Sequence, residues 1–357
     1  MNIRRIRVFL GGYVNFLNAQ NINCRSLSEH LDNNKFEVWT MLLWNQNAQD
    51  FQRISSVHYL KSRRPVRFLG WFPYLIGLFR CDVAYLPKRE YVRFCRLVAR
   101  LSGCKVFTTL EGVLDEELLS RQQYPNQYVE QLRSYEPNLY SISKFMAYSE
   151  KKLHGLQCRE RILYLGTNTD RFLKEPQCPS ELAHIVMIGN DLNRKKASEF
   201  VKMATFFPKI SFHIIGGNEI EGLTVEEYIG KHGMNNVFYH GSLNHSQLSE
   251  LLSKMNLMFF PSRSEGFPKV MLETACAGIP TLCYGDYGAD EWITTGKDGF
   301  VVNTFDEAKA VIQQLVDHPE QLQELSKNAI ELGKHFDWKA LVKDWEDEII
   351  KITDGRL

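Results

Sequence analysis

The sequence predicts an α/β protein in which two parallel β-sheets each carry helices on both faces. Short apolar runs alternate with helical patterns along the whole chain, as they do in successive βαβ units. The apolar runs are almost continuously hydrophobic, which is typical of strands covered on both sides. A length of 357 residues suits two domains of ordinary size. The Pro-containing stretch 174–180 divides the runs into two series and is the natural linker.

The first series contains six predicted strands with helices between them. The strands are Arg7–Leu10, Phe36–Leu43, Asp82–Leu86, Lys105–Thr109, Lys144–Ala147 and Arg161–Leu165. The clearest helical stretches are Gln20–His30 and Arg89–Ser102. Gly11 and Gly12 follow the first strand and predict a tight loop.

The second series also contains six predicted strands. They are His184–Ile188, Ser211–Ile215, Asn236–Tyr239, Leu257–Phe260, Thr281–Tyr284 and Gly299–Val302. Each series predicts a doubly wound, Rossmann-like domain. We expect one such domain over 1–173 and another over 174–337, facing a central cleft. The apolar stripe of Trp338–Ile352 predicts a closing helix within 338–357, which we expect to pack back on the first domain.

Composition and charge exclude several classes of protein. The net charge of +1 hides an asymmetry, because residues 1–110 carry 17 Lys and Arg against 6 Asp and Glu. The eight cysteines form no C-x-x-C pair, so we expect reduced, buried thiols in a cytoplasmic protein rather than disulfides or a zinc site. No apolar run approaches the roughly 20 residues that span a bilayer.

The stretch 257–280 carries the clearest functional signal. A buried strand ends at Pro261, a polar glycine loop follows, and Pro268 stands where a helix is expected to begin. Gly278 is expected to end that helix. The backbone amides of Gly266, Phe267 and Lys269 would then point at an anion above the loop.

Two carboxylates flank this predicted anion site. Glu265 lies in the loop, and Glu273 lies more than one turn into the helix. Carboxylates accept hydrogen bonds from hydroxyl groups, while amides and cations hold phosphates. This combination favours a ligand with both groups, such as a nucleotide sugar.

The pattern P-S-R-S-E-G-F-P-K-V-x-L-E-x-A-x-A-G-x-P at 261–280 strongly resembles the E-x7-E signature of retaining family-four glycosyltransferases (glycosyl transferases group 1), which have the GT-B fold. Members of this family include bacterial enzymes of cell-surface polysaccharide synthesis. Further segments match the family in the same order along the chain. They are 163–172, 186–196, 212–217, 239–243 and 288–302.

The resemblance implies a role for each matching residue. Glu265 would contact the donor sugar or stabilise its positive charge, and Glu273 would bind the ribose hydroxyls. Arg194 and Lys195 would neutralise the diphosphate leaving group. Gly12 would let the backbone approach donor or acceptor, and Leu243 would lie near the base. The implied substrate-binding set is Gly12, Asn190, Leu243, Gly266, Phe267, Pro268, Lys269 and Glu273.

Two positions depart from the family pattern. Asn190 stands where many members have an arginine, which leaves more of the phosphate charge to Arg194 and Lys195. Glu111 follows the fourth predicted strand, where many members have a histidine, and it is a candidate catalytic contributor.

The resemblance implies transfer of a sugar, with retention, from a UDP- or GDP-sugar to a saccharide or lipid-linked saccharide acceptor. No cofactor, metal ion or nucleic acid is expected. A nucleotide-sugar epimerase of the same fold is the alternative enzyme, and a non-catalytic nucleic-acid-binding protein is the alternative from another class.

A basic and aromatic segment over 61–80 bears on localisation. Its cations precede an apolar run that is too short to span a membrane, with Trp71 and Tyr74 as interface anchors. The sequence is equally consistent with a buried helix of the first domain. We therefore expect a cytoplasmic protein, with peripheral contact to an anionic membrane as one alternative.

Overall fold

The computed structural model describes residues 4–16, 18–44, 51–62, 70–88, 91–112, 114 and 125–353. The chain forms two compact units. The first unit comprises Met1–Gly166 and Trp338–Leu357, and the second comprises Thr167–Asp337. Residues 167–173, which we expected in the first domain, therefore fold with the second unit.

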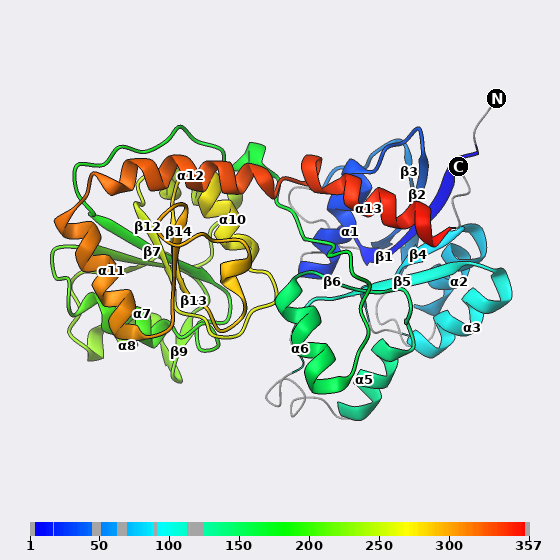
Figure 1. Ribbon diagram of the computed structural model, residues 1–357, viewed down its shortest axis with the longest axis horizontal. Coiled ribbons are helices and arrows are strands. Elements are labelled where there is room, and N and C mark those ends of the chain that lie inside the picture. The colour runs from blue at the N-terminus through cyan, green and yellow to red at the C-terminus, as the bar shows by residue number, and fades with distance from the viewer. Residues whose placement is uncertain are drawn as a thin grey trace. The chain divides into compact units, whose positions relative to one another are not determined.

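The first unit is built on a six-stranded parallel sheet with the order β3-β2-β1-β4-β5-β6 (Figure 1). Its strands are β1 (Ile6–Tyr13), β2 (Phe36–Leu43), β3 (Val57–Ser62), β4 (Val83–Tyr85), β5 (Lys105–Leu110) and β6 (Leu139–Ser141). Its described helices are α1 (Ala19–His30), α2 (Trp71–Arg80), α3 (Val92–Ser102), α5 (Pro125–Arg133), α6 (Lys144–His154) and α13 (Trp338–Ile352). Helix α1 contacts α13, and α2 contacts α3.

Two of the strands predicted for the first unit are wrong. Lys144–Ala147 begins helix α6, because the Ser143 hydroxyl accepts a hydrogen bond from the Met146 amide and so caps a helix at this point. In the segment 161–165, Ile162 makes only an isolated bridge to Ser141. Strands β3 and β6 take the two places in the sheet.

The paired glycines after the first predicted strand do not form a loop. Gly11 and Gly12 continue β1 as far as Tyr13, with a shift in register against β2. A Cβ atom on Gly12 would lie 2.7 Å from the Cys24 Sγ atom of α1. Glycine is therefore needed here because a helix packs closely on the strand.

Helix α13 completes the first unit. The fully buried Trp345 ring lies 5.2 Å from that of Tyr85, and its Nε1 atom donates to the Tyr164 carbonyl at 3.1 Å. The Tyr140 hydroxyl donates to Glu348 Oε2 at 2.9 Å, and the Asp32 amide donates to Glu346 Oε1 at 2.8 Å. These hydrogen bonds join α13 to a strand and two loops that lie between 181 and 314 residues earlier in the chain.

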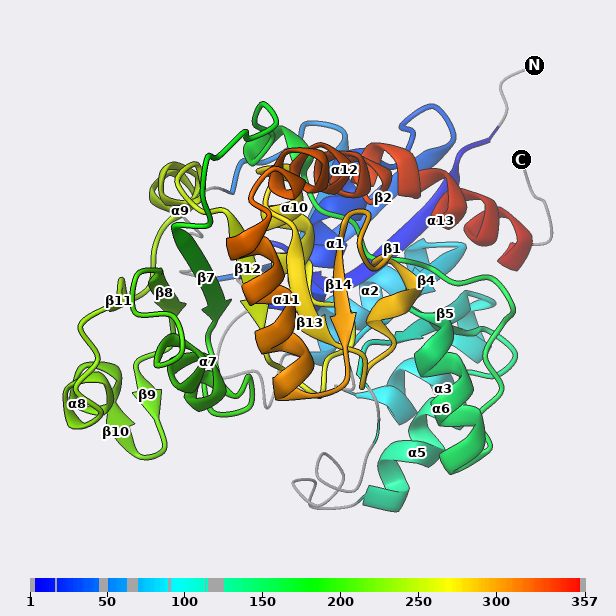
Figure 2. The same cartoon turned by 60° about the vertical axis from the view of Figure 1, so that its left-hand side comes forward.

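The second unit repeats the same strand order in its sheet, β11-β8-β7-β12-β13-β14 (Figure 2). All six strands predicted here are present. They are β7 (His184–Gly189), β8 (Ser211–Gly216), β11 (Val237–Tyr239), β12 (Leu257–Phe260), β13 (Thr281–Tyr284) and β14 (Gly299–Val302). The α-helices are α7 (Ala197–Ala204), α8 (Val225–Lys231), α9 (His245–Leu252), α10 (Lys269–Cys276), α11 (Phe305–Asp317) and α12 (Gln321–His335). A short hairpin, β9 (Glu219–Ile220) and β10 (Leu223–Thr224), and the 3-10 turns η1 (Thr169–Arg171) and η2 (Ala289–Glu291) complete it.

The strand order positions the functional loops of the second unit. The chain leaves β7 toward β8 on one side, and it returns to β12 on the other side of β7. Ligands of doubly wound sheets bind at such a switch point, beyond the carboxyl ends of the strands. The loops that follow β7 and β12 therefore meet at the edge where a ligand is expected.

The described residues bear on three further expectations. Within them, no helix has the length and apolar character to cross a membrane. Six of the eight cysteines are buried, whereas Cys178 is exposed and Cys158 is half-buried. Part of the segment 61–80 lies outside the described residues, and Tyr74 is only 1% exposed. Tyr74 therefore cannot be the interface anchor that the membrane alternative required, whereas its burial fits the alternative of a helix packed in the first domain.

We predict that Trp345→Ala destabilises the first unit by about 3–5 kcal/mol, because the change leaves a cavity among large aromatic rings. Urea unfolding followed by circular dichroism measures the loss. Asp347→Ala, at an exposed position of the same helix, is the matched control and should change stability little. Equal stability of the two variants would contradict the role given to α13.

Candidate functional site

The loop between β12 and α10 places Glu265 at the edge of the second sheet. Ser262 is fully buried at the start of this loop. Pro268 has extended backbone angles and precedes the helix as its cap, so the helix begins one residue later than expected. Gly278 follows α10 with φ +75°, a conformation that favours glycine and ends the helix.

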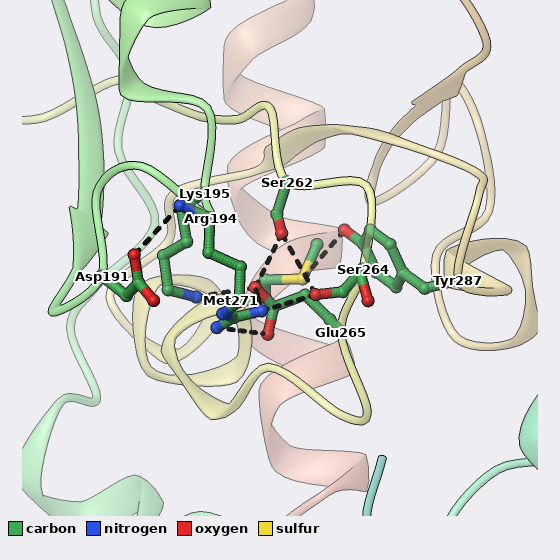
Figure 3. Close-up of polar contacts among 8 residues, drawn as sticks. All are labelled: Asp191, Arg194, Lys195, Ser262, Ser264, Glu265, Met271 and Tyr287. Carbon is green, nitrogen blue, oxygen red and sulfur yellow. Dashed lines mark hydrogen bonds and ion pairs between the residues drawn. The ribbon is translucent and has the colours of Figure 1, made fainter. Parts of the chain in front are cut away.

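Three side chains converge on one carboxylate oxygen (Figure 3). Glu265 Oε1 accepts hydrogen bonds from Lys195 Nζ at 2.8 Å, Ser262 Oγ at 2.7 Å and Arg194 Nη1 at 3.0 Å. Arg194 also donates to the Ser264 carbonyl at 2.5 Å. The turn after β7 and the loop after β12 are thus joined by charge-assisted hydrogen bonds, the stronger kind in proteins.

The turn after β7 explains how the two cations reach this loop. A Cβ atom on Gly189 would lie 2.1 Å from Lys195 Cδ, so the lysine stem crosses the end of the strand where only glycine leaves room. The Arg194 amide donates to Asp191 Oδ1 at 3.0 Å, which closes the turn. The Lys195 ammonium lies 4.4 Å from the centre of the Phe260 ring.

Two cations and the carboxylate of Glu265 form the centre of the cluster, and Asp191 contributes a second carboxylate beside them. Lys195 is 8% exposed, and burial lowers its pKa while the carboxylate of Glu265 opposes that change. Arg194 keeps a partly exposed guanidinium beside the same carboxylate. Both cations contact Glu265 at the strand ends, where they can also contact an anion such as a phosphate group.

Glu273 lies on α10, eight residues after Glu265. Burial raises the pKa of its carboxyl group, and the charges of Lys269 and Arg171 oppose that rise. Among the residues that the structure describes, the Glu273 carboxylate has no hydrogen-bond partner. A carboxylate held in this way is available to accept hydrogen bonds from the hydroxyls of a ligand.

Three strand-end turns lie next to this cluster. The Gly217 amide donates to the Gly189 carbonyl at 2.8 Å, and the Gly216 amide donates to the Gly241 carbonyl at 2.8 Å. Asn190 is exposed directly after Gly189, and its carbonyl oxygen packs against Gly217. The turns after β7, β8 and β11 therefore form one row of backbone.

The remaining predicted residues have clear positions. Leu243 is half-exposed in the loop that begins at Gly241. Gly266 and Lys269 flank the start of α10, while the Phe267 ring is buried against Trp292 and Phe336. The Phe267 side chain thus anchors the loop in the core.

In the first unit, Glu111 follows β5 within a hydrogen-bond network. Its Oε1 atom accepts from the Tyr85 hydroxyl at 3.0 Å, from Thr109 Oγ1 at 3.2 Å and from Asn23 Nδ2 at 3.4 Å. Glu111 and Lys88 line a cavity of about 370 Å³ at the carboxyl ends of β4 and β5. Gly12 is not among the residues that line this cavity.

Sequence reasoning missed several of these residues. Ser262 lies in the glycine loop after Pro261, but a serine in a loop gives no signal of its own. Phe260 and Tyr85 lie inside apolar strands, where an aromatic residue usually means only core packing. Only the pairing of neighbouring strands shows that they reach Lys195 and Glu111.

Comparison with known proteins identifies the class. Residues 168–332 match the family model of glycosyl transferases group 1. Sucrose-phosphate synthase from Thermosynechococcus elongatus superposes with a TM-score of 0.80 at 16% identity, covering 98% of this chain and 100% of that chain. HepE from Anabaena, solved in complex with UDP-glucose, gives a TM-score of 0.76 at 12% identity, covering 97% and 100%.

Among sequence relatives, alpha-galactosylglucosyldiacylglycerol synthase from Streptococcus pneumoniae is 25% identical over 177 residues, which are 46% of this chain and 44% of the synthase. Across three curated relatives, the alignments span 38–58% of their lengths. These matches confirm the predicted resemblance and the fold. The match to the glycosyl transferases group 1 model covers nearly the whole second unit, and the chain has the GT-B fold.

We predict that Glu273→Gln stabilises the protein at neutral pH by at most about 1 kcal/mol, because the half-buried carboxyl group loses only part of its hydration. Because burial raises the pKa of Glu273 in the folded state, ionisation of this carboxyl costs folding free energy. The cost is absent below the unfolded-state pKa and appears as the pH rises through the folded-state pKa. The advantage of the variant should therefore vanish as the pH falls into the ordinary range of glutamate.

Urea unfolding at a series of pH values measures this difference. Glu181→Gln, at an exposed position, is the control and should match the wild type at every pH. A Glu273→Gln variant that is less stable than the wild type at neutral pH would show that the carboxylate is compensated within the protein.

Proposed function

We propose that this chain is a retaining glycosyltransferase that uses a nucleotide diphosphate sugar. The single observation that carries the proposal is the convergence of Arg194, Lys195 and Glu265 at the switch point of the second sheet, with Glu273 following on α10. Cations suit the diphosphate, and carboxylates suit sugar and ribose hydroxyls. A UDP-glucose complex of HepE, a protein of similar fold, supports a uridine donor. A guanosine donor is the other candidate.

The charges suggest how the sugar is transferred. Negative charge builds on the diphosphate as the bond from its oxygen to the sugar carbon breaks, and Arg194 and Lys195 stabilise that charge. The departing oxygen can take the proton of the acceptor hydroxyl on the same face of the sugar, so the configuration is retained without a covalent enzyme intermediate. Glu265 holds the sugar hydroxyls during the step. Because two protein cations supply the positive charge, the proposal includes no metal ion or cofactor.

Donor binding would change the partners of Glu265. Lys195 is fixed by Gly189 and Phe260, whereas Arg194 is partly exposed and has room to move. When a diphosphate binds Arg194 and Lys195, the Glu265 carboxylate loses part of its contacts with these cations. It then becomes available for the donor sugar, which couples phosphate binding to sugar binding.

We also propose a class of acceptor. We assign a saccharide or lipid-linked saccharide, consumed in polysaccharide or glycoconjugate synthesis. The cavity of the first unit supports this assignment, because Glu111, Lys88 and Gln20 give it polar groups of the kind that bind hydroxyls. We place the reaction in the cytoplasm, in keeping with six buried, unpaired cysteines.

We predict that one of the UDP-, GDP-, ADP- and dTDP-sugars stabilises the wild type against thermal unfolding. At about 100 times its dissociation constant, the ligand should add roughly 2.7 kcal/mol. The same ligand should stabilise neither Glu273→Ala nor Lys195→Ala. Lys254→Ala, an exposed lysine of the second unit, is the matched control and should respond like the wild type. Absence of a shift with every donor would overturn the proposal.

We predict further that the product keeps the anomeric configuration of the donor sugar. The reaction is run with the donor that stabilises the wild type in thermal unfolding and with a panel of saccharide acceptors. Nuclear magnetic resonance of the first product formed, before any mutarotation, then gives its anomeric configuration. An inverted product would refute the same-face mechanism while leaving sugar transfer intact. Consumption of the donor without any acceptor, with a changed sugar, would instead indicate an epimerase.

A further inference from the structure

The helices α2 and α3 expose large apolar side chains to solvent. Phe72 and Phe79 on α2 are 49% and 57% exposed, and Leu97 and Leu101 on α3 are 57% and 72% exposed. Apolar side chains of this size are usually covered in a folded protein, and a group of them on one surface marks an interaction site. We call this surface, with the exposed arginines described next, the α2–α3 face.

The charges on the α2–α3 face all have one sign. Arg80 ends α2, and Arg93 and Arg100 lie on α3 beside the exposed leucines, all three exposed. Neither helix contains an aspartate or glutamate. The apolar side chains are thus interleaved with cations that have no acidic neighbour on their own helix.

The two helices present these residues on the same side of the first unit. They contact each other, with the Trp71 ring 5.7 Å from the Phe94 ring. Tyr74 and Leu78 of α2, and Cys95 and Val98 of α3, are buried. The exposed residues recur at intervals of four and seven on the opposite stripe of each helix, so both stripes face away from the sheet.

We propose that the α2–α3 face binds the surface of an anionic lipid bilayer. Phenylalanine and leucine side chains can enter the boundary between headgroups and acyl chains, and guanidinium groups can hold the lipid phosphates. Insertion into a bilayer stabilises exposed apolar side chains that are flanked by cations, and it requires no groove of defined shape. A protein partner of this face would need a matching acidic surface, and a second copy of the face would bring like charges together. This surface keeps α2 from the segment 61–80, adds α3, and goes beyond the proposed transfer reaction.

Co-sedimentation of the full chain with vesicles tests the proposal without any transfer assay. The wild type should bind vesicles of phosphatidylglycerol and phosphatidylcholine, bind pure phosphatidylcholine far more weakly, and lose affinity as salt is raised. Phe72→Ser/Leu97→Ser should bind at least about tenfold more weakly. Arg93→Glu/Arg100→Glu should weaken binding by at least about 25-fold, at about fivefold for each arginine.

The controls distinguish vesicle binding by the α2–α3 face from nonspecific adsorption and from misfolding. Tyr148→Ser/Leu153→Ser removes two equally exposed apolar side chains from α6 and should bind like the wild type. Circular dichroism and the melting temperature must match the wild type for every variant. The proposal is overturned if the wild type does not bind anionic vesicles, if either α2–α3 variant binds like the wild type, or if the α6 variant loses binding equally. Donor-induced stabilisation is independent of all these outcomes.

Discussion

The contact of Lys195 and Arg194 with Glu265 is the interaction on which the functional edge of the second unit depends. It joins two loops whose strands are neighbours in space but lie some 70 residues apart in the chain. A buried ammonium would be costly alone, and the carboxylate together with the Phe260 ring makes it tolerable. Glycine is required at position 189 because the Lys195 stem occupies the space that a side chain would need.

The two glutamates of the site are held in opposite ways. Glu265 is surrounded by donors, so its position is fixed before any ligand arrives. Glu273 is half-buried without a hydrogen-bond partner among the described residues, and its partial desolvation is a cost that a ligand hydroxyl can offset. Such uncompensated groups are common where binding takes precedence over stability. The spacing of eight residues therefore joins one preorganised carboxylate to one that gains its partner on binding.

Much of the second unit could be predicted from the sequence, because its strands are continuous apolar runs bounded by glycine and proline. Two strands of the first unit, by contrast, could not be predicted from the sequence. β3 (Val57–Ser62) mixes apolar and polar residues at the sheet edge, and β6 (Leu139–Ser141) is too short to give a period. Lys144–Ala147 is apolar enough for a strand, but the capping hydroxyl of Ser143 makes it a helix. At the site, the charged residues were predictable from motif order, whereas Ser262 and Phe260 were not, because tertiary contact alone gives them their roles.

The return of α13 to the first unit has a consequence for how the protein is made. The polypeptide emerges from the ribosome from its amino end, so residues 167–337 are complete before Trp338–Ile352 is synthesised. Until then, the aromatic rings that receive Trp345 have no covering helix. The unit that starts first in the chain is therefore the one that finishes last. A nascent chain stalled before α13 would present an open apolar surface to chaperones while its second unit is already able to fold.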